Sequence, residues 1–117
     1  MQSIYITGTG FWIPEDGLTT NDEVVNSYNT FVDNFNESNA QAISLGSIEA
    51  MSHSSSEFIE KASGIKTRYL FDKQNCLDPN RMKPKTTPEL PDNTSILAEM
   101  GIESAKMAIE NAGITPD

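Results

Sequence analysis

Several residue types and segments are scarce in this 117-residue chain, and each scarcity excludes a class of protein. The single cysteine, Cys76, allows no internal disulfide bond, which is typical of a reducing compartment. The single histidine, His53, has no second imidazole beside it for a metal set or a Cys-His catalytic pair. No apolar run reaches the roughly 18–20 residues that cross a membrane, and the first residues lack the layout of a signal peptide. We therefore expect a cytoplasmic protein without a metal site or a membrane span.

Basic residues are absent from the first 60 positions and gather in one later segment. Seven of the eight lie between Lys61 and Lys85, against only Asp72 and Asp78, so this segment carries +5 in a chain of net charge −9. A local positive surface attracts anionic ligands that the overall charge would repel. A chance distribution over a solvated loop explains the pattern equally well. No nucleic-acid partner is expected.

The first half of the chain predicts one strand and two helices. Residues 3–9 are β-rich and run into a glycine turn. Thr20 and Glu23 form a capping box, which predicts a helix start. Residues 36–52 are more polar, and a helix is predicted there with a break at Gly46. The predicted apolar face of the first helix consists of Val24, Val25, Tyr28, Phe31, Val32 and Phe35.

The second half predicts two further helices around one strand. Ser54 with Glu57 repeats the capping-box pattern, and Gly64 stands where a left-handed helix end belongs. Residues 65–71 alternate roughly between apolar and basic, which predicts a strand with one face toward solvent or ligand. Residues 72–92 contain four prolines and no periodicity, as in a functional loop, a binding arm or a disordered segment.

The last predicted helix is capped by Asp92 or Asn93 and closed by Gly113. One of its faces carries small residues, which predicts close packing against another helix or a sheet. These residues are Gly101, Ser104, Ala105, Ala108 and Ala112. Two predicted strands are too few to cover the apolar faces of three or four helices. We therefore expect an α/β protein of which this chain is an opening fragment.

No group of residues in the chain makes a complete catalytic site. Gly8-Thr9-Gly10 follows the first predicted strand, but Ile13 occupies the third glycine position of a dinucleotide motif and Pro14 blocks the helix. A turn is the favoured interpretation. The carboxylates are spread over helix surfaces, and no pair stands out as acid and base. His53 and Cys76 are interpreted as exposed residues without a catalytic role.

Phe58, on the short predicted helix, has two interpretations. A phenyl ring at helical spacing from Ile59 and Ala62 is most often part of a core. The same ring at the helix edge could stack on a flat ligand, whose phosphates the neighbouring basic segment would hold.

Four motifs occur in an order and spacing typical of one family across nearly the whole chain. They are Ile6-Thr7-Gly8-Thr9-Gly10 with Ile13-Pro14-Glu15; Thr20-Asn21-Asp22-Glu23; Glu57-Phe58-Ile59 with Ser63-Gly64-Ile65-Lys66-Thr67-Arg68-Tyr69; and the helix Ser95 to Ala112 with Gly113-Ile114. The chain thereby resembles the beginning of β-ketoacyl-acyl-carrier-protein synthase III and its thiolase-fold relatives. The resemblance implies the first part of the N-terminal half of a layered αβαβα fold, spanning residues 1–117.

The resemblance also implies an activity and a set of partners. The family condenses an acyl-CoA, or another acyl thioester, with malonyl-acyl-carrier-protein in fatty acid biosynthesis, and we expect a cytoplasmic homodimer. CoA enters as a thioester substrate, and no separate cofactor is expected. The family's cysteine, histidine and asparagine are expected after Asp117, so this chain holds no catalytic residue and alone is expected to be inactive. A noncatalytic thiolase-like subunit and an independent acidic interaction domain are the alternatives.

The CoA-binding residues of the family are only partly matched. Phe58 stands where the family has its adenine-stacking tryptophan, and Ala62 stands where it has an arginine, so Lys61 is the candidate for a phosphate contact. Residues 29–52 and 72–92 resemble insertions in relatives that handle longer or unusual acyl chains, the first a helical insert and the second a proline-rich basic loop. Both CoA and carrier proteins are anionic. The proposed carrier-protein contacts are Arg81, Lys83 and Lys85.

Overall fold

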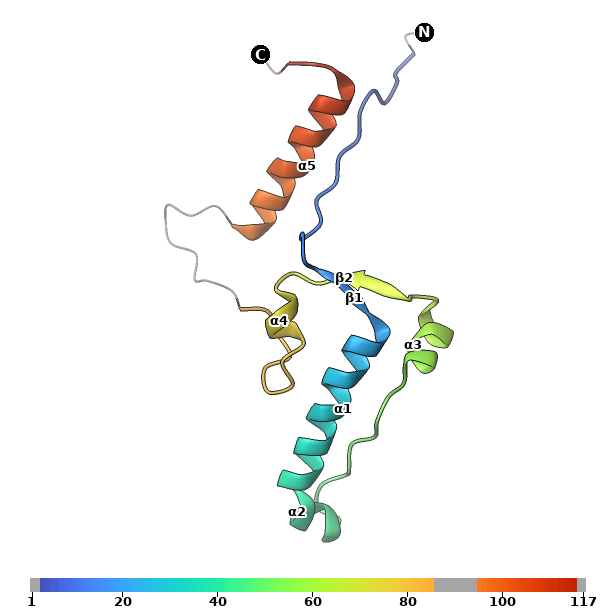
Figure 1. Cartoon of the computed structure of the whole chain (residues 1–117), viewed down its shortest axis with the longest axis vertical. Helices are drawn as coiled ribbons and strands as arrows, with labels where there is room; N and C mark the ends of the chain where they lie inside the picture. The colour runs from blue at the N-terminus through green and yellow to red at the C-terminus, as the bar shows by residue number, and fades with distance from the viewer. Residues whose placement is uncertain (1–2, 86–94, 116–117) are drawn as a thin grey trace. The chain divides into compact units, whose positions relative to one another are not determined.

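The computed structural model describes residues 3–85 and 95–115, which belong to two compact units (Figure 1). The central unit comprises Pro14–Lys85. The terminal unit comprises Met1–Ile13 and Thr86–Asp117. Among the described residues, no helix combines the length and the apolar character needed to cross a membrane.

The central unit is built on a two-stranded sheet. Its elements are β1 (Leu18–Thr20), α1 (Asn21–Ser38), α2 (Ala40–Ser44), α3 (Ser56–Ser63), β2 (Thr67–Tyr69) and α4 (Lys73–Cys76). The strands are antiparallel, with Thr19 opposite Arg68. Thr19 is fully buried, and its hydroxyl donates to the Gly17 carbonyl at 2.9 Å. Mixed helices and a small sheet agree with the predicted α/β class.

The predicted capping box at the start of α1 is confirmed. The Thr20 hydroxyl accepts from Glu23 N at 3.3 Å, and the Glu23 carboxylate accepts from Thr20 N at 2.8 Å. The predicted apolar face lies inward, although only Val25 and Val32 are buried among the apolar side chains that the structure describes. The predicted break at Gly46 is also confirmed, because this residue follows α2 with a φ of +72°. The helix predicted over residues 36–52 does not resume after the break, because residues 47–52 are not helical.

The first predicted strand is wrong, and a real strand was missed. Residues 3–9 form no strand, since no other described strand lies beside them to supply a ladder of hydrogen bonds. The real first strand, β1, has three residues, which is too short for an alternating pattern to stand out. The predicted solvent face of β2 is also reversed, because Arg68 is half-buried whereas Tyr69 is 49% exposed.

The start of α3 lies one residue later than predicted. Ser55 is the N-cap, and its hydroxyl accepts from Phe58 N at 3.1 Å. Ser54 does not cap the helix, because its backbone N–H and carbonyl both bond to the Asn29 side chain, at 2.9 Å and 3.0 Å. The predicted helix end is confirmed, with Gly64 at a φ of +71°.

The proline-rich loop is more ordered at its start than its composition predicts. Residues 73–76 form α4, and a hydrogen-bonded turn follows at residues 78–82. Residues 86–92 of the predicted loop lie outside the described part of the chain.

The terminal unit consists of α5 (Ile96–Ala112) and an extended segment, residues 3–13. Ser95 caps α5, with its hydroxyl accepting from Ala98 N at 3.3 Å, so the predicted caps Asp92 and Asn93 are wrong; both lie outside the described residues. Gly113 closes α5 as predicted, at a φ of +66°.

Close packing on the small-residue face of α5 is confirmed at Ser104, Ala108 and Ala112, but against an extended segment, whereas Gly101 and Ala105 are exposed. A Cβ atom built on Gly8 would lie 2.6 Å from Ala112 N, and one built on Gly10 would lie 2.6 Å from Ala108 N. The Asn111 side chain donates to the Thr9 carbonyl at 2.8 Å. The two glycines therefore let the backbone of the segment lie directly on the helix.

Candidate functional site

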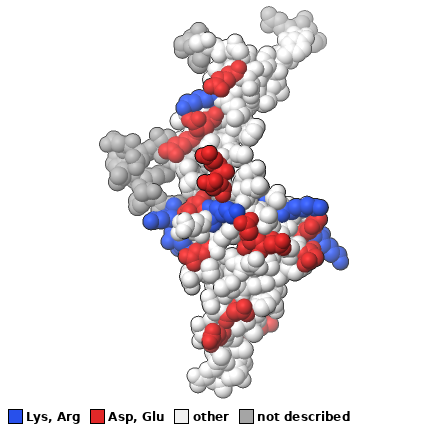
Figure 2. Space-filling view, in the orientation of Figure 1, with Lys and Arg blue, Asp and Glu red and all other residues white. Residues whose placement is uncertain are grey.

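The basic residues of the central unit gather in one region. On the face shown in Figure 2, blue atoms lie in a band at the level where Figure 1 labels β1, β2, α3 and α4. The far end of α1 shows only acidic and uncharged atoms on this face. The sequence cluster is thus also a cluster in space.

Two of the lysines are paired with carboxylates of the same unit. Lys73 Nζ lies 2.6 Å from a Glu23 carboxylate oxygen and donates to the Leu18 carbonyl at 2.7 Å. This contact, together with the Thr20 backbone bond, lowers the pKa of Glu23. Lys66 Nζ lies 3.1 Å from a Glu60 oxygen. Lys73 therefore ties α4 to β1 and to the start of α1.

Arg68 serves the fold as well. Its guanidinium donates to the side-chain oxygen of Asn21, the first residue of α1. The Asn21 amide in turn donates to the Ile65 carbonyl at 2.7 Å, and Asn21 is only 5% exposed. Arg68 thus holds the helix start to the strand, and the interpretation of this strand as a ligand-facing basic surface does not apply to Arg68.

The exposed positive charge lies mainly in a segment that we call the basic turn, residues 78–85. Arg81 N and Met82 N both donate to the Asp78 carbonyl, at 2.9 Å and 2.8 Å. The Arg81 guanidinium donates to the Lys83 carbonyl at 3.1 Å. Lys85 N donates to the Asp72 carboxylate at 2.6 Å. The predicted trio Arg81, Lys83 and Lys85 is therefore brought together on one ordered, exposed turn.

Asp72 anchors this turn to α4. Two hydrogen bonds of 2.9 Å from the Asn75 side chain, then the Lys85 backbone bond, lower the pKa of the Asp72 carboxyl. Burial, and secondarily the Asp72 charge, raises the pKa of the Cys76 thiol. Cys76 is half-buried rather than exposed as predicted, and a raised pKa disfavours the reactive thiolate.

A hollow of about 610 Å³, which we call the Phe58 hollow, lies between α1, α3 and the basic turn. Its lining residues are Val24, Val25, Tyr28, Ser52, His53, Ser54, Ser55, Phe58, Ile59 and Met82. Phe58 is 66% exposed, so it does not pack into a core among the described residues, and its stacking on a flat ligand stays a prediction. Lys61 is exposed on α3, three residues after Phe58, and does not line the hollow.

Of the lining residues His53 and Met82, only His53 was singled out from the sequence. His53 is exposed as predicted, and its Nε2 lies 2.7 Å from an Asp33 carboxylate oxygen. Met82 was missed by the sequence reasoning, because a methionine between two bases in a proline-rich loop carries no periodic or motif signal. Only the folded turn shows that it reaches the same hollow as Phe58.

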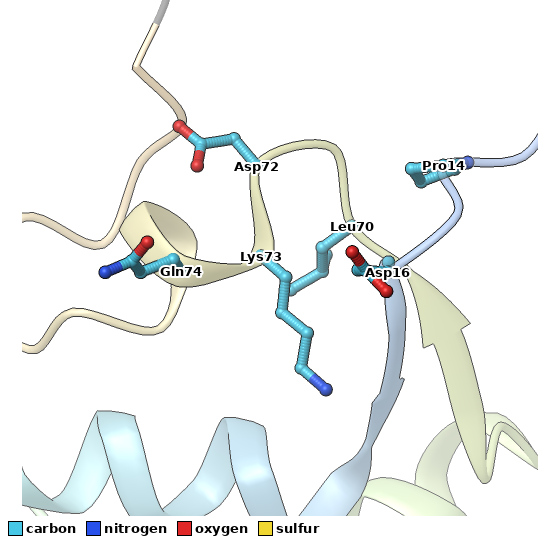
Figure 3. A pocket seen from close by; sticks show the side chains of 7 residues that line it. Pro14, Asp16, Leu70, Asp72, Lys73 and Gln74 are labelled. Atoms are coloured by element: carbon cyan, nitrogen blue, oxygen red, sulfur yellow. The ribbon is translucent and has the colours of Figure 1, made fainter.

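A second hollow, of about 490 Å³, lies between the entry to β1 and α4 (Figure 3). Pro14 and Asp16 line one side and Gln74 the other, while the Asp72 and Lys73 side chains point away from each other. Because both of these charges already have partners within the unit, the hollow offers little for a charged ligand.

No family model matches the chain. Over 87 residues, or 74% of its length, the chain is 48% identical to the β-ketodecanoyl-[acyl-carrier-protein] synthase of Pseudomonas aeruginosa. The predicted resemblance to a β-ketoacyl-acyl-carrier-protein synthase is thereby confirmed. The aligned part covers 25% of that synthase, so the chain spans about a quarter of the length of the curated relative it matches.

Proposed function

We propose that this chain is the first part of a synthase III-like condensing enzyme that joins an acyl-CoA, or another acyl thioester, to malonyl-acyl-carrier-protein. The identity of 48% over 87 residues is the observation that carries this proposal. In this proposal the complete protein has the thiolase fold and works as a cytoplasmic homodimer. The segment supplies scaffold, dimer surface and part of the approach for substrates.

The length of the acyl donor follows from condensation chemistry and the name of the relative. A malonyl unit loses CO₂ as its α-carbon attacks the acyl thioester, so the chain grows by two carbons and the donor's thiol leaves. A β-ketodecanoyl product, with ten carbons, therefore requires an eight-carbon acyl donor. We propose a donor of this length for the present protein.

None of the described residues is proposed as the nucleophile. Cys76 is the one cysteine of the chain, and its raised pKa and half-burial are the opposite of what an attacking thiol needs. The proposed site residues of this segment therefore act in binding. Phe58 and Lys61 are proposed for CoA, and the basic turn for the carrier protein.

The activity is tested with the full-length protein, octanoyl-CoA and malonyl-acyl-carrier-protein. The expected product is β-ketodecanoyl-acyl-carrier-protein, identified by its mass, with acetyl-CoA giving a much lower rate. A preference for acetyl-CoA would remove the proposed chain length. No condensation product with any acyl-CoA would remove the enzyme proposal and favour the noncatalytic thiolase-like subunit.

Carrier-protein docking is tested by reversing the charges of the basic turn. The triple variant Arg81→Glu, Lys83→Glu, Lys85→Glu is expected to raise the KM for malonyl-acyl-carrier-protein by roughly tenfold or more at low salt, because complementary charge accelerates encounter. High salt should shrink the difference. Lys106→Glu on α5, where the lysine is 2.7 Å from Glu103, is the control and should change the KM little. An unchanged KM and salt dependence in the triple variant would contradict docking at this turn.

A further inference from the structure

The Phe58 hollow has two exposed walls that come from segments far apart in the sequence. Phe58 on α3 is 66% exposed, and Met82 in the basic turn is 38% exposed. Apolar side chains of α1, among them Val24 and Val25, complete the lining. A hollow of about 610 Å³ whose lining is largely apolar, with a few hydroxyl groups and the His53 imidazole, suits a flat organic ring. Aromatic rings and thioethers both bind such rings through their faces and edges.

The backbone holds Met82 in an unusual conformation at this place. Its φ of +50° lies in the left-handed region, which a residue with a long side chain seldom occupies. The bond from Met82 N to the Asp78 carbonyl, at 2.8 Å, belongs to the turn that enforces this conformation. Outliers of this kind persist where the surrounding structure fixes them and are frequent at ligand sites.

Positive charges accompany both walls. Arg81 and Lys83 directly flank Met82, and Lys61 follows Phe58 by about one helical turn. All three are exposed. Glu57 and Glu60 are also exposed on α3, so the excess positive charge comes from Arg81 and Lys83 of the basic turn. This charge favours a ligand in which a flat ring is joined to anionic groups, as in the nucleotide end of CoA.

We propose that Met82 is a ligand-contact residue that forms the second wall of the nucleotide site, so that the ring of the CoA nucleotide lies between its thioether and the Phe58 ring. This inference rests on the proposed function for the identity of the ligand. Met82 then determines affinity for the nucleotide part of the substrate and has no part in binding the acyl chain.

The test compares two thioesters in the full-length protein, octanoyl-CoA and octanoyl-pantetheine, which lacks the nucleotide. Met82→Ala is expected to raise the KM for octanoyl-CoA by roughly threefold to tenfold and to leave kcat and the KM for octanoyl-pantetheine unchanged. Met82→Leu keeps most of the volume but not the sulfur, and a rise of about twofold is expected. The matched control is Met107→Ala, in the terminal unit, where the methionine is 36% exposed.

Several outcomes would overturn the inference. An equal change in KM with both thioesters in the Ala and Leu variants would show that Met82 contacts the acyl or pantetheine part. An unchanged KM in both variants would show that Met82 does not contact the substrate.

Calorimetric titration of free CoA separates this inference from the proposed function. If the protein makes no β-ketoacyl product but binds CoA more weakly after Met82→Ala, the site stands without the synthase. If CoA does not bind to the unaltered protein, the site is lost as well.

Discussion

Each of the two units is stabilised internally by a different kind of contact. In the terminal unit, backbone lies on backbone, because Gly8 and Gly10 face the small side chains of α5. In the central unit, asparagine side chains bridge distant backbone groups. Asn21 bonds to Ile65, Asn29 to Ser54 and Asn36 to Met51, with distances of 2.7 to 3.0 Å.

This difference teaches where each unit tolerates change. Close backbone packing requires residues without a Cβ atom. A single added methyl group therefore destabilises the unit at the contact and has little effect on stability away from it. Polar bridging depends on paired donors and acceptors, so losing one partner leaves the other unsatisfied in a partly buried position. Few apolar side chains are fully buried, since Val25 and Val32 are the buried ones among the described residues.

The largest effect is expected from Gly10→Ala. The new methyl group would fall on the Ser104 carbonyl oxygen and lie 2.6 Å from Ala108 N, and overpacking of this kind costs about 3 kcal/mol. Hydrogen exchange of the α5 amides should accelerate accordingly. Gly101→Ala is the control on the same helix, because a Cβ there meets nothing within 4 Å. The control should stabilise α5 by about 0.5–1 kcal/mol. Equal hydrogen-exchange rates of the α5 amides in the two variants would contradict the close contact at Gly10.

A smaller loss is expected from Asn21→Ala in the central unit. The variant leaves the Ile65 carbonyl and the Arg68 guanidinium without their partner, at a cost of about 2 kcal/mol in the free energy of unfolding. Asn21→Asp keeps the oxygen that faces Arg68 and should recover part of this loss. Asn26→Ala, at an exposed position of α1, is the control. Urea unfolding measures all three, and a loss in the control as large as that in Asn21→Ala would contradict the bridging role.

Local signals in the sequence predicted the helices well. The capping box at Thr20 and the left-handed glycines Gly64 and Gly113 involve only neighbouring residues, so their patterns act wherever they occur. The N-cap of α3 was predicted one residue too early, at Ser54. The Asn29 side chain, which is 25 residues away in the sequence, forms hydrogen bonds with the Ser54 backbone instead. Tertiary contacts of this kind leave no trace in a local pattern.

The strands and the site show the same limit. Residues 3–9 have the composition of a strand, but a strand also needs a partner, and among the described residues α5 packs only against the Gly8–Gly10 end of this segment. Ile4, Tyr5 and Ile6 stay largely exposed. The basic segment was recognised from charge alone, yet Arg68 and Lys73 are used within the fold while Arg81 and Lys83 remain exposed. Charge counting cannot separate these roles, because burial and pairing depend on the folded positions.

The smallest loss of stability is expected from Glu23→Gln, and this loss should depend on pH. Lys73 and the Thr20 backbone lower the pKa of Glu23 below its ordinary value of 4.5. A lowered folded-state pKa stabilises the protein at pH values above the unfolded pKa, and this contribution is lost as the pH falls through the folded pKa. Glutamine keeps an acceptor for the capping box but has no charge for Lys73. The difference in urea midpoint between the protein and the Gln variant should therefore be present at neutral pH and vanish under acid. Glu49→Gln, at an exposed position, is the control, and a pH-independent difference for Glu23→Gln would show that its charge does not support the junction of α1, β1 and α4.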